Sequence, residues 1–212
     1  PRKLVNTLGE VVSRHGISQL RLAETEKYAH VTYFFNGGAE QPLPGEERSM
    51  VPSPKVASYA EQPEMSAAEV AQKLIEAINT RTFSFLVVNF ANADMVGHTG
   101  DLHATIKAVE TLDGLFKPLV EEIIRQGGVV MMTADHGNAE VMVNSQTGEI
   151  NKEHTANAVP LLIIGKNFMQ EKQTPPDLST YIPSGVSADI APTILKIMGV
   201  GIPPEMTGEP LV

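Results

Sequence analysis

The 212-residue chain is acidic and contains no cysteine: 25 Asp and Glu residues outnumber 16 Lys and Arg residues, and the net charge is −9. The absence of thiols excludes a disulfide framework and a thiolate zinc site. The negative charge disfavours nucleic acid and anionic membranes as main partners, and no apolar run approaches the roughly 20 residues of a membrane span, so we expect a cytoplasmic protein.

The first 65 residues contain one strand pattern and a proline-rich segment. Residues 17–23 alternate between apolar and polar side chains, as in a short, half-buried strand. Residues 27–35 fit either a strand or a helix, and Gly37 and Gly38 end the element in both cases. Residues 41–65 contain five prolines, which predict an extended loop over the surface.

A helix is predicted to begin at Ser66, because Ser66 and Glu69 have the spacing of a capping box. Its apolar stripe consists of Val70, Leu74, Ile75 and Ile78. Residues 83–90 form a continuous apolar run, which is typical of a parallel strand buried on both faces.

A second helix is predicted over residues 101–126, and Pro118 should kink it or divide it in two. The residues expected to face the core are Ile106, Val109, Leu112, Phe116, Leu119 and Ile123.

The rest of the chain predicts two further buried strands, at 129–133 and 159–164, and a last helix at 189–198 that Gly199 ends. Alternating strands and helices indicate a three-layer α/β domain with a mostly parallel sheet. In such sheets the functional residues gather at the carboxyl ends of the strands.

Potential metal ligands follow the predicted strands. Asp94 and His98 come after the strand at 83–90, Asp135 and His136 follow the strand at 129–133, and His154 precedes the strand at 159–164. Carboxylate and imidazole groups suit divalent ions such as manganese or zinc. Each pair alone is weak evidence, because Asp-His-Gly is also an ordinary turn, but one sheet edge would gather all of them.

The other three histidines lack this context. His15 lies beside a Gly16 turn, His30 in an apolar stretch, and His103 on the exposed side of a helix, only two residues after Asp101. Two residues apart on a helix is a poor arrangement for sharing an ion. We interpret all three as structural or exposed.

Several sequence blocks together resemble the cofactor-independent phosphoglycerate mutases of the alkaline phosphatase superfamily. The metal-binding blocks of that family resemble residues 92–100, 133–140 and 154–155, and further blocks are similar to residues 26–38, 53–56, 63–67 and 205–208. The similarity runs from about residue 15 to the C-terminus in the order of the family. Ala60 departs from the family pattern, in which Asp is expected after Tyr59.

The resemblance implies an alkaline-phosphatase-like fold and two Mn²⁺ ions, with no bisphosphoglycerate. Asp94, His98 and His154 would hold the first ion, and Asp135 with His136 would help hold the second. Lys27 would lie beside the phosphoryl group; its alternative interpretation is an ordinary surface lysine. The family interconverts 3- and 2-phosphoglycerate in glycolysis and gluconeogenesis through a phosphoserine intermediate.

Two parts of that family are not found in this sequence. One part contains the serine nucleophile and a further metal-binding aspartate, which opens an Asp-Gly-x-Gly turn, and the other is a second domain that grips the substrate; neither is recognisable here. We therefore expect residues 1–212 to be the C-terminal portion of the phosphatase domain, inactive alone, with one complete metal site.

The full enzyme should be a monomer, whereas an uncovered sheet edge would favour self-association of this chain. The serines interpreted as structural are Ser13, Ser18, Ser49, Ser53, Ser58, Ser66 and Ser84.

Two alternatives stay open. One is another phosphomutase or a phosphatase of the same superfamily. The other is a non-catalytic metal-binding protein whose role is interaction.

Overall fold

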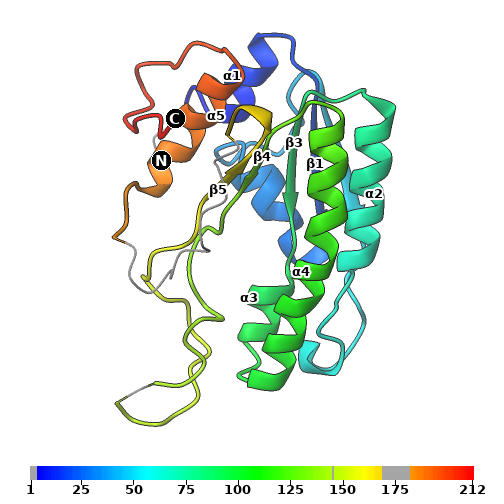
Figure 1. The fold of residues 1–212 in the computed structure, drawn as a ribbon, viewed down its shortest axis with the longest axis vertical. Helices are drawn as coiled ribbons and strands as arrows, with labels where there is room; N and C mark the ends of the chain where they lie inside the picture. Colours follow the sequence, from blue (N-terminus) through cyan, green and yellow to red (C-terminus); the bar gives the residue numbers. More distant parts are fainter. Residues whose placement is uncertain (1–3, 145, 169–181) are drawn as a thin grey trace.

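A computed structural model describes residues 4–144, 146–168 and 182–212 (Figure 1). Its main sheet has three parallel strands in the order β2-β1-β3, and a separate antiparallel ladder joins β4 and β5. The strands are β1 (Gln19–Glu24), β2 (Glu46–Val51), β3 (Phe85–Asn89), β4 (Val130–Met132) and β5 (Leu162–Ile164).

Helices cover both faces of the main sheet, so the predicted three-layer α/β architecture with a parallel sheet is confirmed (Figure 1). Leu20 and Leu22 of β1 pack with α2 and α4, whereas Phe85 of β3 packs with α1 and α5. The helices are α1 (Leu8–Arg14), α2 (Ala67–Thr80), α3 (Asn92–Gly97), α4 (Leu102–Arg125) and α5 (Ile190–Ile197). Shorter turns are η1 (Thr25–Lys27), η2 (His30–Phe34), η3 (Tyr59–Glu61), η4 (Lys166–Phe168) and η6 (Ser187–Asp189).

The prediction of a surface loop throughout residues 41–65 is wrong, because this segment contains strand β2. The prolines at 44 and 52 flank the strand, so residues 46–51 keep the backbone N–H groups that a ladder requires. β2 pairs with β1 from Glu46 opposite Gln19 to Val51 opposite Glu24. Val51 is fully buried in the core.

Strand burial also differs from the prediction. β1 is buried along its whole length rather than half-buried, because it has a strand on either side and helices on both faces. Its polar Arg21 stacks on Phe35 and Phe85, with the guanidinium carbon 4.4 and 5.4 Å from the ring centres. In contrast, β3 is mostly half-buried, since β1 is its only strand neighbour among the described residues.

The strands predicted at 129–133 and 159–164 are shorter than expected and are not buried. They correspond to β4 and β5, which pair with each other in antiparallel orientation, with Met131 opposite Ile163. Each of these strands has only three residues and only one strand partner among the described residues, which leaves it partly exposed.

The helix predicted at Ser66 is present as α2, but the capping box is not. The Ser66 hydroxyl donates instead to the carbonyl oxygen of Pro52 at 2.7 Å, and it accepts no hydrogen bond from the helix. A contact with the preceding loop therefore takes the hydroxyl away from the helix end.

Helix α4 is continuous across Pro118, so of the two predicted effects of this proline, a kink or a division into two helices, the division is wrong. Leu112 and Leu119 are buried as predicted, but Ile106 and Val109 are 47% and 46% exposed. The first turns of α4 pack against α3 through the small residues Ala104 and Ala108, and this contact rotates the larger apolar side chains outward.

The segment that fitted either a strand or a helix forms the turns η1 and η2, which bring Lys27 to the end of the sheet. The predicted C-terminal helix is α5, followed by Gly199 with a positive φ of 68°. No helix among the described residues is both long enough and apolar enough to cross a bilayer.

Candidate metal centre

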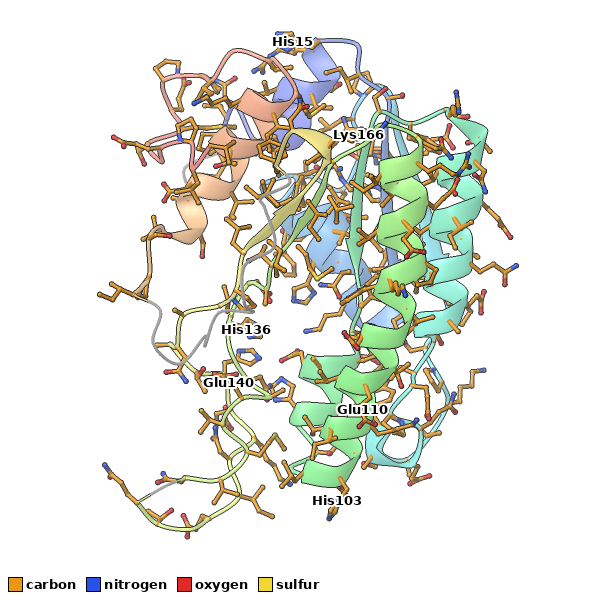
Figure 2. All side chains as sticks on the ribbon, viewed as in Figure 1. His15, His103, Glu110, His136, Glu140 and Lys166 are labelled. Carbon is orange, nitrogen blue, oxygen red and sulfur yellow. The ribbon has the colours of Figure 1, made fainter. Side chains whose placement is uncertain are left out.

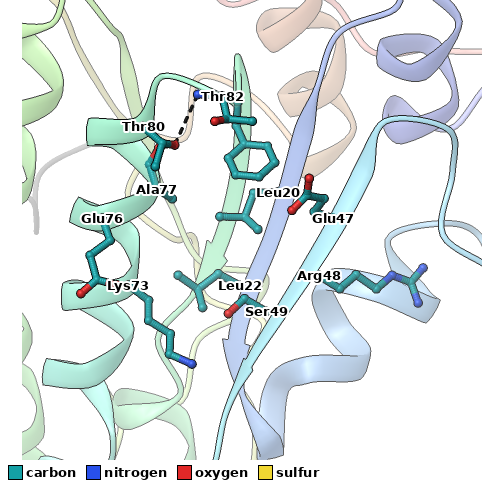
Figure 3. Close-up of a pocket in the computed structure, with 11 residues that line it drawn as sticks. Leu20, Leu22, Glu47, Arg48, Ser49, Lys73, Glu76, Ala77, Thr80 and Thr82 are labelled. Atoms are coloured by element: carbon teal, nitrogen blue, oxygen red, sulfur yellow. Dashed lines mark hydrogen bonds between the residues drawn. The ribbon is translucent and has the colours of Figure 1, made fainter.

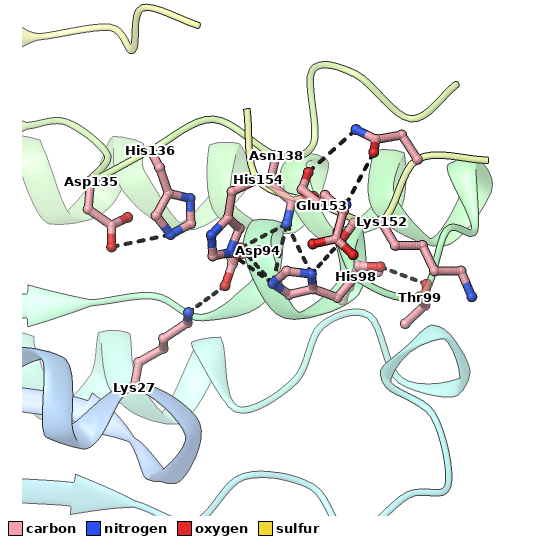
Figure 4. A network of polar contacts seen from close by, with 12 residues as sticks. Lys27, Asp94, His98, Thr99, Asp135, His136, Asn138, Lys152, Glu153 and His154 are labelled. Atoms are coloured by element: carbon pink, nitrogen blue, oxygen red, sulfur yellow. Dashed lines mark hydrogen bonds and ion pairs between the residues drawn. The ribbon is translucent and has the colours of Figure 1, made fainter. Parts of the chain in front are cut away.

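The predicted ligands come from three separate segments and meet beyond the carboxyl ends of β3 and β4 (Figure 4). Asp94 lies in the short helix α3, and His98, one turn later, caps the C-terminal end of that helix. Asp135 and His136 follow β4 directly, and His154 comes from the loop that leads to β5. The predicted groups therefore meet, but at the ends of strands from two separate sheets rather than at one sheet edge.

Three donor atoms form a compact triad. Oδ1 of Asp94 lies 3.2 Å from Nε2 of His98 and 3.3 Å from Nε2 of His154, and the two imidazole nitrogens are 3.1 Å apart. Ligand atoms about 2.1 Å from one ion lie roughly 3.0–3.4 Å from each other. The triad thus has the spacing that a single divalent ion requires.

The tautomer of His98 supports the same interpretation. Nδ1 of His98 is 2.6 Å from the carbonyl oxygen of Lys152, which can only accept a hydrogen bond, so Nδ1 carries the proton. In the neutral ring, Nε2 then presents a lone pair toward the carboxylate of Asp94. Two acceptors that face each other at this distance are stabilised by a shared cation, and a backbone carbonyl on the far nitrogen is the usual support for a metal-ligating histidine.

Lys27 is buried at the end of η1 and forms an ion pair with Oδ2 of Asp94 (Figure 4). Burial raises the pKa of Asp94, but the hydrogen bond and charge of Lys27 and a hydrogen bond from Asn138 oppose it, and the net pKa is lowered. The carboxylate is therefore ionised at neutral pH and available as a ligand. The alternative of a surface lysine is wrong.

Asp135 and His136 form a second, smaller group. Oδ2 of Asp135 lies 3.4 Å from Nε2 of His136, and the His136 ring stacks on His154 with a centroid distance of 3.6 Å. Nδ1 of His136 is buried and has no hydrogen-bond partner among the described residues. Within the described ranges, only Asp94, His98 and His154 form a group of three potential ligands, so this pair lacks a third donor.

Two residues at the site were not predicted. Asn138 is buried and donates from its amide nitrogen to Oδ1 of Asp94 at 2.9 Å. His30, interpreted as structural, lies near enough to the site for its charges to act on it: burial and Lys27 lower the pKa of His30, against the opposing effect of Asp135. Asn138 follows Asp135-His136-Gly137 in the sequence, and this neighbourhood was the only available signal.

The remaining histidines and several serines match their structural interpretation. Figure 2 shows His15 and His103 at opposite ends of the molecule, away from His136; Nδ1 of His15 bonds to the carbonyl of Val11 at 2.9 Å, and His103 is exposed. The hydroxyls that bond to backbone groups are those of Ser13, Ser18, Ser53, Ser58 and Ser66.

A groove of about 660 Å³ lies between α2 and the strands β1 and β2 (Figure 3). Its lining includes Leu20, Leu22, Lys73 and Glu76 but none of the groups of the metal centre. It contains no histidine and no cluster of potential ligands, so it does not compete with the triad as a candidate site.

Gly97 gives Asn138 the space to reach Asp94. A Cβ atom at position 97 would collide with the side-chain oxygen of Asn138. We expect Gly97→Ala to displace this amide and to lower Mn²⁺ affinity about 10-fold, because groups that support metal ligands typically contribute that much. Isothermal titration calorimetry checks this, with Gly201→Ala as the control, since a Cβ there meets open space. Equal affinities for the two variants would show that Asn138 does not support the site.

Comparisons with known proteins agree with this geometry. The family model of the metalloenzyme superfamily matches residues 1–202. The 2,3-bisphosphoglycerate-independent phosphoglycerate mutases of Gloeobacter violaceus and Clostridioides difficile are 52% and 49% identical over all 212 residues. The chain spans only 39% and 40% of the length of these relatives. A crystal structure of Leishmania mexicana phosphoglycerate mutase at low cobalt concentration matches 99% of this chain and 40% of its own, with 31% identity and a TM-score of 0.85.

Proposed function

The chain belongs to the metalloenzyme superfamily, and from this premise we propose that it is the metal-binding part of a 2,3-bisphosphoglycerate-independent phosphoglycerate mutase. The observation that carries the proposal is the triad of Asp94, His98 and His154, whose donor atoms lie 3.1–3.3 Å apart. The relatives that match all 212 residues support the activity. The whole enzyme would interconvert 3- and 2-phosphoglycerate in the cytoplasm, in glycolysis and gluconeogenesis.

The donor set fits a divalent ion such as Mn²⁺. One carboxylate and two imidazoles, with no thiolate in the chain, favour an ion of intermediate hardness. A bound ion would supply Lewis acidity and offset the charge of a phosphoryl group. We propose Asp94, His98 and His154 as the ligands of the first ion, and Asp135 with His136 as part of a second site.

The residues around the triad have separate tasks in this proposal. Lys27 places an ammonium group beside Asp94, where it would neutralise a phosphate oxygen brought to the site. The carbonyl of Lys152 keeps the proton of His98 on Nδ1, so that Nε2 faces the ion. Asn138 orients the carboxylate of Asp94 by donating to Oδ1.

The 212 residues alone are proposed to bind one ion and to leave phosphoglycerate unchanged. Asp135 and His136 lack a third donor among the described residues, and five of the serines are engaged with backbone groups outside the centre. We therefore regard this chain as the metal-binding portion of the phosphatase domain. The serine nucleophile and the substrate-gripping domain would come from other parts of the enzyme.

Calorimetry and a coupled enzyme assay test these statements. Titration with Mn²⁺ is expected to show one tight site per chain, and conversion of 3-phosphoglycerate to 2-phosphoglycerate, measured with Mn²⁺ and without bisphosphoglycerate, should stay at the background rate. The absence of Mn²⁺ binding would contradict the metal-binding role. Turnover well above background would instead show that this chain contains a nucleophile.

A further inference from the structure

Glu140 connects two loops of the metal centre. Its Oε2 accepts a hydrogen bond from the backbone N–H of Asn138 at 2.7 Å. Its Oε1 accepts from the hydroxyl of Thr155 and from the side-chain amide of Asn157 at 3.1 Å. One exposed carboxylate therefore joins the loop after β4 to the loop before β5, and Figure 2 shows Glu140 close to His136.

The two connected loops carry the stacked imidazoles. His136 lies two residues before Asn138, and His154 directly precedes Thr155. The backbone N–H of Thr155 also donates to the carbonyl of Gly137 at 2.8 Å. The carboxylate and this backbone bond together close a small ring of contacts, beside which His136 stacks on His154 with a centroid distance of 3.6 Å.

Gly137 lies beside the Glu140 carboxylate, and its lack of a side chain leaves room for that group. A Cβ atom at position 137 would collide with Oε1 of Glu140 and with the hydroxyl of Thr155. The glycine hence leaves the space that the Glu140–Thr155 hydrogen bond occupies. A side chain at this position would displace the Glu140 carboxylate or the Thr155 hydroxyl.

The chemistry of the contact requires a carboxylate. Three donors converge on the two oxygens of Glu140, and only an ionised carboxylate has acceptors on both sides. A glutamine would turn its amide N–H₂ toward either the backbone N–H of Asn138 or the donors of Thr155 and Asn157. The donors that faced the N–H₂ group would then lose their hydrogen-bond acceptor.

We propose that Glu140 is a positioning residue that holds the imidazoles of His136 and His154 at their metal-binding spacing. This inference rests on the metal-binding role proposed above and assigns a further residue to it. Glu140 acts through the hydrogen bonds that it accepts from Asn138, Thr155 and Asn157, and it is not one of the three donors of the triad. Supporting groups of this kind typically change metal affinity 10- to 100-fold.

The test combines affinity with a spectroscopic measurement on the metal-free chain. Glu140→Gln is expected to weaken Mn²⁺ binding about 10- to 100-fold in calorimetry. It should also shift the ring-proton NMR resonances of His136 and His154, because the ring-current effect of stacking is lost. Glu110→Gln, which makes the same change at an exposed position of α4, is expected to change neither quantity.

Variants of Thr155 separate positioning from general stability. Thr155→Ser keeps the hydroxyl and should retain the affinity and the resonances of the unaltered chain, whereas Thr155→Val should reproduce the effect of Glu140→Gln. Unchanged imidazole resonances in Glu140→Gln would overturn the proposal even if the unaltered chain bound no Mn²⁺. Changed resonances with unchanged Mn²⁺ affinity would overturn its link to the metal.

Discussion

Replacing Asp94 with asparagine is expected to lower the Mn²⁺ affinity of the chain by at least about 100-fold, since groups that only support ligands already contribute 10- to 100-fold. Asp94 is the one anionic member of the triad, and its Oδ1 lies within 3.3 Å of both imidazole nitrogens. An amide is neutral and turns either an oxygen or two N–H donors toward the ion. Calorimetric titration of Asp94→Asn with Mn²⁺ measures the effect.

The matched control is Asp113→Asn, which removes the same charge from an exposed position of α4. Its Mn²⁺ affinity should equal that of the unaltered chain, because net charge alone contributes little to a coordinated ion. If Asp94→Asn bound Mn²⁺ as tightly as this control, the triad would not be the metal site.

Replacing Leu22 with alanine is expected to reduce the free energy of unfolding by about 3 kcal/mol, within the 2–5 kcal/mol typical of large-to-small core substitutions. Leu22 is fully buried on β1, where it packs with Val51, Val70 and Leu74. Truncation leaves a cavity that strands and helices on this face cannot close without moving the sheet. Equilibrium urea denaturation, followed by circular dichroism, measures the change.

Leu102→Ala is the control, because Leu102 begins α4 and is 49% exposed. The same deletion there removes little buried surface and should cost less than about 1 kcal/mol. A similar loss for both variants would mean that the core does not lie between β1 and α2 as described.

The metal centre illustrates how far sequence patterns reach. Asp94 and Asp135 were found because each follows a predicted strand, although the structure places β3 and β4 in different sheets. Lys27 was assigned to the site through the resemblance alone. Glu140 lies in the block 133–140 that resembles the family, but nothing in the sequence indicates its role, because its partners Thr155 and Asn157 are 15 and 17 residues away and meet it only after the loops have folded.

The incorrect predictions about the fold have a similar origin. Ser66 has the spacing of a capping box, yet its hydroxyl bonds to Pro52 instead. Ile106 and Val109 have the period of a buried helix face, yet α3 packs against a neighbouring face of small side chains. In both cases a local preference lost to a contact made by another segment.

The sequence by itself determined the α/β class, the approximate positions of the main helices and of β1, β3, β4 and β5, and the residue types that could bind a metal. These properties depend on side-chain period, chain breakers and motif spacing, all of which are local. Only the tertiary structure decided the pairing of β2 with β1, the face that α4 buries and the contacts that join Glu140 to Thr155. These depend on hydrogen-bonding groups and surfaces from distant segments, whose relative positions are set when the layers pack.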